Sequence, residues 1–141
     1  MPEISLVDDV VTVVGRERTL THRPREVRLD DGTVVAHESV GGTLSSAWAT
    51  DLGDLFVEVV HLGDGPRGAE LVLVVTEHDV VSLGDLYVHD VPAAVPATWP
   101  VAIDLALGLL TDDTRVLTPS GEVTRADVEA LHQRLLGVLH G

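Results

Sequence analysis

Asp85 is the residue that the sequence best places to do chemistry. It follows the apolar run 80–83 within Gly84-Asp85-Leu86, so a buried strand would deliver a carboxylate to a loop. Such a carboxylate can serve as a general base or a metal ligand, or it can cap backbone N–H groups of a turn, and the sequence leaves both interpretations open. His22 is a second candidate, either as an acid–base group with an ordinary pKa near neutrality or as a partly exposed structural histidine.

Apolar runs of strand length surround these two residues. Most of them are rich in Val and bounded by Gly, Asp or Pro, which is typical of strands buried on at least one face. Asp31-Gly32, between two of the runs, is a strong signal for a hairpin turn. We predict strands over residues 4–7, 10–14, 27–29, 33–37, 55–62, 71–76, 80–83 and 115–118.

Two helices are predicted in the second half of the chain. The first covers 101–110, after Trp99-Pro100, and the second begins at a sequence like a capping box, Thr124 to Asp127. The three- and four-residue spacing of their apolar residues gives each helix one buried face. The residues expected on these faces are Ile103, Ala106, Leu107 and Leu110, then Val128, Leu131, Leu135 and Val138.

Composition narrows the possible partners. The formal net charge is −14 and the chain has no Cys, which argues against nucleic-acid binding, anionic membranes and thiolate metal sites. Neither an internal repeat nor a linker interrupts residues 1–141, so we expect a single domain. We also expect a cytoplasmic protein, because no apolar run is long enough to span a membrane. Residues 38–53 are predicted to be a loop, with one short helical turn near 44–48, and residues 89–98 a Pro-rich loop.

Basic residues are concentrated in one segment. Residues 16–28 hold five of the nine Arg and two Glu, a local charge of +3 against −17 for the rest of the chain. The segment could bind an anionic substrate or a carboxylate-bearing partner. The commoner outcome in an acidic protein is pairing with its own Asp and Glu.

Several short motifs occur in a recognisable order. They are Thr21-His22-Arg23-Pro24-Arg25-Glu26-Val27, Ala36-His37-Glu38, Gly84-Asp85-Leu86, a helix led by Trp99, and Pro119-Ser120-Gly121. From Leu20 to Leu139 this order resembles that of the metallo-β-lactamase-fold hydrolases. The resemblance implies an α/β fold, a reduced αββα sandwich in which two mixed sheets are covered by helices.

The departures from the family pattern concern the metal ligands. His22 keeps the first ligand position, whereas Pro24 and Val27 stand where the family has His, and Glu26 stands where it has Asp. Pro66 or Arg67 falls where a further His belongs, and the last motif has no His. Asp85 matches the family's bridging carboxylate. Pro and Val side chains offer no lone pair, so we expect no metal, no other cofactor and no metallohydrolase activity.

The resemblance gives three alternative functions. In the first, the former active-site cleft serves a small molecule, in a binding protein or a non-hydrolytic cyclase, lyase or isomerase. The residues His22, Glu26, Arg67 and Asp85 would line this cleft as catalytic groups, with His61, His89 and Trp99 as ligand-binding residues. The second is a structural or regulatory subunit without an active site. The third is a residual one-metal hydrolase with His22, Glu26 and Asp85 as ligands.

Two further expectations accompany these alternatives. Arg67 would supply the positive charge that the absent metals once gave, unless it is a solvated loop residue. The N-terminal part is short for the family, which would leave an apolar edge or face that a second copy covers. We therefore expect a homodimer.

Overall fold

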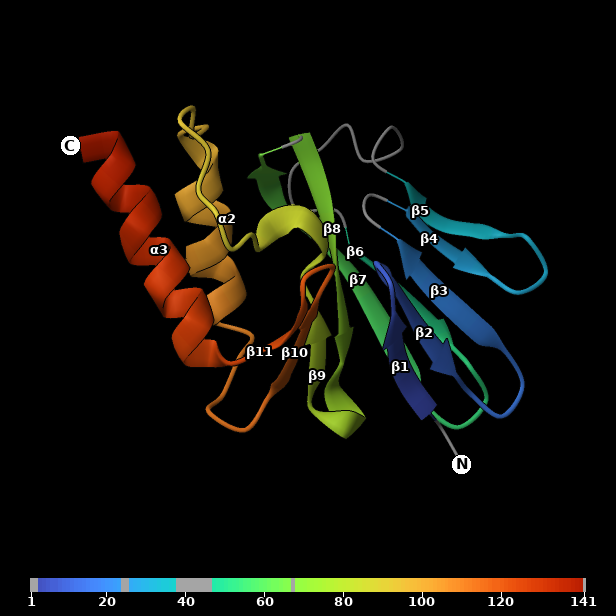
Figure 1. Cartoon of the computed structure of the whole chain (residues 1–141). Coiled ribbons are helices and arrows are strands. Elements are labelled where there is room, and N and C mark those ends of the chain that lie inside the picture. The colour runs from blue at the N-terminus through green and yellow to red at the C-terminus, as the bar shows by residue number, and fades with distance from the viewer. Residues whose placement is uncertain (1–2, 24–25, 38–46, 67, 141) are drawn as a thin grey trace.

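Two β-sheets pack face to face, and helices lie on the outer side of one of them (Figure 1). The computed structural model describes residues 3–23, 26–37, 47–66 and 68–140. Within these residues, no helix is long and apolar enough to cross a membrane.

The first sheet is an antiparallel meander. Its five strands follow chain order because each hairpin turn places the next strand beside the last. Asp8 and Gly32 occupy two of these turns with positive φ angles of 56° and 91°, and Gly32 belongs to the predicted Asp-Gly hairpin. The strands are β1 (Glu3–Val7), β2 (Val10–Val14), β3 (Thr19–Arg23), β4 (Glu26–Leu29) and β5 (Val34–His37).

The second sheet has six strands in the order β11-β10-β9-β8-β7-β6. Only β9 and β10 run parallel, because the chain between them crosses over through helix α2 (Thr98–Leu107). The strands are β6 (Ala47–Asp51), β7 (Phe56–Gly65), β8 (Gly68–Val75), β9 (Val80–Ser82), β10 (Arg115–Thr118) and β11 (Gly121–Val123).

Two apolar layers hold this arrangement together. The layer between the sheets includes Val11 and Leu20 from the first sheet and Val59 and Leu73 from the second. The layer between the second sheet and the helices is centred on Trp99, which is completely buried. Alternate residues of β8 point into different apolar layers, one between the sheets and one under the helices. Because both faces of the strand are buried, its apolar run is continuous.

Helix α3 (Arg125–His140) starts as the sequence predicts. The Asp127 carboxylate accepts hydrogen bonds from the Thr124 N–H, at 2.8 Å, and from the Thr124 hydroxyl, at 3.0 Å. The Thr124 hydroxyl in turn accepts one from the Asp127 N–H. On the predicted core face, Val128, Leu131 and Leu135 are buried. Val138, in the last turn of the helix, is 45% exposed.

The predicted α/β sandwich of two sheets and covering helices is confirmed, and two of its details need correction. Among the described residues, helices α2 and α3 both cover the second sheet. The first sheet is antiparallel throughout rather than mixed. Residues 47–51 form strand β6 instead of a loop, and the rest of the predicted helical turn lies outside the described residues.

Candidate functional site

Several of the elements that carry the predicted residues meet at one end of the sandwich, the upper end in Figure 1. In the first sheet, the register pairs Val11 with His22, so the β1–β2 turn and the end of β3 lie at the same level. In the second sheet, the end of β9, the start of β8 and the short 3₁₀ helix η2 (Gly84–Leu86) meet there. We call this end of the sandwich the rim.

His22 links the two sheets across the apolar layer. Its Nδ1 lies 2.7 Å from the Ser82 hydroxyl oxygen on β9, and its Nε2 lies 3.1 Å from the Leu71 carbonyl oxygen on β8. A carbonyl can only accept, so Nε2 carries the proton and donates it. Nδ1 is then the acceptor for the Ser82 hydroxyl. Both ring nitrogens are therefore used inside the protein.

Burial decides the charge of this histidine. His22 is 2% exposed rather than partly exposed. Burial lowers its pKa from 6.5 to about 4, while the hydrogen bond to the Leu71 carbonyl acts in the opposite direction. His22 is consequently neutral at physiological pH, and its interactions make it a bridge between the sheets.

Ser82 forms a hydrogen-bonded pair with this histidine, a partnership that local sequence reasoning missed because Ser82 lies inside a strand. A serine that donates to an imidazole is the arrangement of an activated nucleophile. Ser82 is also only 2% exposed, however, so a substrate cannot reach its Oγ in this conformation. The pair holds the sheets together and presents no open nucleophile.

Asp85 lies in η2, next to a glycine in the left-handed backbone conformation. Gly84 has a positive φ of 56°. A Cβ added at Gly84 would come within 2.5 Å of Oε1 of Glu70, so the buried carboxylate of Glu70 packs directly against this backbone. On the side of the helices, the indole Nε1 of Trp99 donates a hydrogen bond to the Leu86 carbonyl oxygen at 2.8 Å. Asp85 itself is half-buried. The residues before and after Asp85 are thus held by Glu70 and by Trp99.

Glu70 was also missed by the sequence reasoning, although a signal for it exists. It is a lone carboxylate at the start of the apolar run of β8, and it is completely buried. Charged side chains are almost never fully buried unless they are paired. A lone carboxylate within the apolar run of a buried strand can therefore be recognised in the sequence as a candidate for a paired, buried group.

His61 belongs to the same end of the molecule. It pairs in register with Leu71 and alternates with Val57 and Val59, which lie in the layer between the sheets. His61 therefore faces this layer and is 7% exposed. Leu71 thus contacts both histidines: it is the register partner of His61, and its carbonyl oxygen accepts the hydrogen bond from His22.

Glu26 is not brought to His22. Its neighbour Val27 lies in the layer between the sheets, so the Glu26 side chain projects on the opposite, outer face of the first sheet. There its Oε1 pairs with Nη2 of Arg28 at 2.8 Å. This contact is the expected internal pairing of the basic segment. Arg67, the fourth predicted residue of the cleft, lies outside the described residues.

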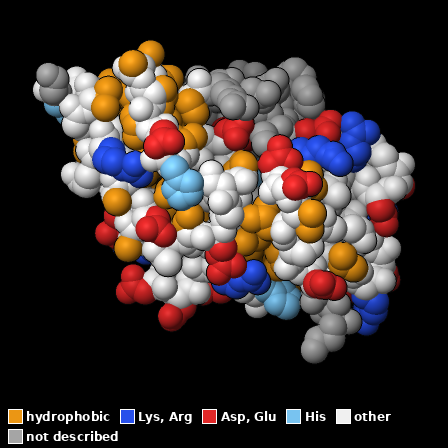
Figure 2. Space-filling view, in the orientation of Figure 1, with side chains coloured by type: hydrophobic (Ala, Val, Ile, Leu, Met, Phe, Trp, Pro, Cys, Tyr) orange, Lys and Arg blue, Asp and Glu red, His pale blue; other side chains and the backbone are white. Residues whose placement is uncertain are grey.

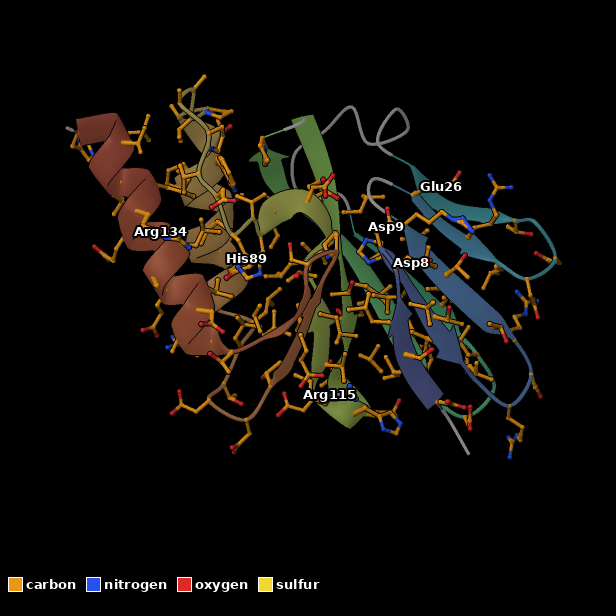
Figure 3. All side chains as sticks on the ribbon, viewed as in Figure 1. Asp8, Asp9, Glu26, His89, Arg115 and Arg134 are labelled. Carbon is orange, nitrogen blue, oxygen red and sulfur yellow. The ribbon has the colours of Figure 1, made fainter. Side chains whose placement is uncertain are left out.

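His89 and Trp99 do not line the rim. His89 lies on the helical side of the molecule with Arg134, whereas Asp8, Asp9 and Glu26 lie on the first sheet (Figure 3). The Tyr87 ring packs edge-on against the His89 ring at 5.3 Å. A surface pocket of about 410 Å³ lies beside His89 and Arg134. Trp99 is enclosed in the helical core and cannot stack on a ligand.

The residues present do not fit the one-metal centre of the third alternative. The His22 nitrogens are engaged with Leu71 and Ser82, and Glu26 points away. In the described ranges, no group of three or more His, Cys, Asp or Glu is arranged to hold a metal ion. The set His22, Glu26 and Asp85 therefore does not form the ligand shell that the one-metal alternative requires.

Comparison with known proteins agrees with this architecture. No family model matches the sequence, and no curated protein matches it. Among solved structures, a metallo-β-lactamase from Pontibacter korlensis matches with a TM-score of 0.56 and 9% sequence identity. The match covers 96% of this chain and 99% of that one. At this identity the likeness concerns the fold alone, and the chain has a metallo-β-lactamase-like fold.

Proposed function

We propose that this chain is a metal-independent protein of the metallo-β-lactamase-like fold that uses the rim around Asp85 for a small molecule. The observation that carries the proposal is the hydrogen bonding of His22. Its two ring nitrogens are committed to Leu71 and Ser82, so the one histidine retained from the first motif is not available as a ligand. The protein is then a binding protein or a non-hydrolytic enzyme.

The distribution of buried polar groups supports a binding role for the rim. Glu70, His61 and Ser82 are buried and Asp85 is half-buried. Glu70 and Ser82 lie near strand ends at the rim, Asp85 lies in η2, and His61 lies within β7 in register with Leu71. Buried polar groups reduce stability unless their interactions compensate for the lost hydration. A few convergent polar groups in otherwise apolar surroundings are typical of small-molecule sites. In a cyclase, lyase or isomerase, Asp85 would serve as the general base.

A ligand screen with matched variants tests this proposal. Thermal unfolding of the purified protein is measured against a library of small metabolites, because a bound ligand raises the transition temperature. We expect a hit that stabilises the wild type and the control Asp112→Asn, which changes an exposed residue away from the rim. Asp85→Asn should lose the stabilisation. A hit that stabilises Asp85→Asn as strongly as the wild type contradicts the proposed site.

One observation favours the alternative of a subunit without an active site. The His22–Ser82 bridge fills the space between the sheets, and both side chains are closed to solvent. If the library gives no hit and Asp85→Asn changes neither stability nor any ligand response, this alternative is the better account.

A further inference from the structure

Helix α2 carries apolar side chains on two opposite faces. Its inner face, which includes Trp99, is buried against the second sheet and α3. On the outer side Val101 is 59% exposed, Leu105 is 51% exposed and Leu109 is 39% exposed. Val101 and Leu105 are four residues apart on one side of α2, and Leu109 follows in the turn directly after the helix, where its N–H donates to the Ala106 carbonyl at 2.9 Å. We call these three exposed residues the α2 stripe.

The stripe is unusual for a surface helix. Such a helix normally has one apolar face toward the core and charged residues on the other. Asp104 is the only charged residue of α2, and it lies beside the stripe. Contiguous exposed apolar surface, unlike single scattered residues, is a feature of contact sites for other proteins.

The charge around the stripe indicates the chemistry of the partner. Asp104 is exposed, and the exposed Asp112 and Asp113 follow the stripe at the C-terminal end of α2. Their side chains make no ion pair or hydrogen bond within the described part of the chain. The C-terminal end of a helix also carries partial negative charge. The stripe is thus apolar along its length and anionic at its side and end.

A second copy of this chain is a poor occupant. Antiparallel pairing of two stripes about Leu105 would bring the two Asp104 carboxylates to the same side of the contact, where they repel each other. The net charge of −14 adds a longer-range repulsion, and acidic side chains are spread over the surface in Figure 2. The same charge disfavours anionic membranes.

We propose that the α2 stripe binds the apolar face of a basic amphipathic helix of another protein. Apolar side chains of that helix would cover Val101, Leu105 and Leu109. Its Lys or Arg residues would pair with Asp104 at the side and with Asp112 and Asp113 at the end. This is the helix-docking mode of recognition, with anchors on one apolar line and specificity from flanking charges.

A designed peptide tests the proposal directly. The probe is a fluorescein-labelled amphipathic helix of Leu and Lys, and its binding to the full chain is followed by fluorescence anisotropy at physiological salt. We expect binding to the wild type, about tenfold weaker binding to Leu105→Ser, and weaker binding to Asp104→Asn. Val101→Ser is a second stripe variant in case Leu105→Ser does not fold, as judged by circular dichroism.

Matched controls separate this contact from general attraction to an acidic protein. Val7→Ser removes an apolar side chain that is 67% exposed on β1, in the sheet that helices α2 and α3 do not cover, and should bind like the wild type. A peptide with the same Leu and Lys in scrambled order should bind much more weakly. Equal binding of both peptides, or an equal loss in Val7→Ser, overturns the proposal. So does a wild-type dimer in light scattering that Leu105→Ser converts to a monomer, because the occupant is then a second copy.

Discussion

The bridge from His22 to Ser82 makes the stability of this fold depend on pH. The folded state holds His22 neutral with a pKa of about 4, whereas in the unfolded chain the pKa is the ordinary 6.5. Unfolding therefore takes up a proton in the range between about pH 6.5 and about pH 4. The free energy of unfolding falls as pH decreases through this range, and the loss is complete below about pH 4.

The size of the effect follows from the pKa difference. One pKa unit corresponds to about 1.4 kcal/mol, so lowering the His22 pKa from 6.5 to about 4 makes the total loss about 3 kcal/mol. By linkage, about 2 kcal/mol of this is lost already at about pH 5. The free energy of unfolding of a domain is typically roughly 5–15 kcal/mol, so protonation of one histidine would remove a considerable part of it.

Urea denaturation followed by circular dichroism measures this dependence. The range from about pH 7 to pH 5 is suitable because ordinary Asp and Glu side chains remain mostly ionised there. We expect the wild type to lose about 2 kcal/mol over this range, and His22→Gln to lose much less, although the variant is less stable at every pH. The matched control is His78→Gln, which changes an exposed histidine and should keep the wild-type slope.

The slope isolates protonation from packing, because lost contacts shift the stability of His22→Gln equally at all pH values. Equal slopes for the wild type and His22→Gln would refute the reasoning. NMR of the imidazole gives an independent check. A neutral ring protonated at Nε2 should persist in the folded protein down to about pH 5. A ring that titrates near its ordinary value would show that the bridge is not formed.

Three further substitutions test other contacts. Ser82→Ala should cost about 1–3 kcal/mol of unfolding free energy in urea denaturation, because the buried imidazole loses its donor. Gly84→Ala should destabilise the fold by at least about 1 kcal/mol, since the new Cβ would meet Glu70 at 2.5 Å. Gly137→Ala, a control on α3 with open space around the new Cβ, should instead gain up to about 1 kcal/mol. Trp99→Phe should lower the thermal midpoint, because a buried backbone carbonyl loses its hydrogen bond.

Most of the secondary structure could be predicted from local patterns. The Val-rich runs became strands, and the Asp-Gly signal became the β4–β5 hairpin, because a turn and the pattern beside it act over a few residues. Strand β6 could not be predicted in this way. Its residues Ala47–Asp51 have no strong strand pattern, and they form a strand by pairing with Phe56–Val60 of β7.

For the site, the sequence by itself determined which donors are missing. Pro24 and Val27 have no side-chain lone pair, and no fold can restore one. Only the tertiary structure decided what His22 does instead. Its partner Ser82 lies 60 residues away in the chain, and local periodicity gives the face of a strand but not the residue opposite it in another sheet. The contact of Glu70 with Gly84 was hidden for the same physical reason, because packing across layers determines it.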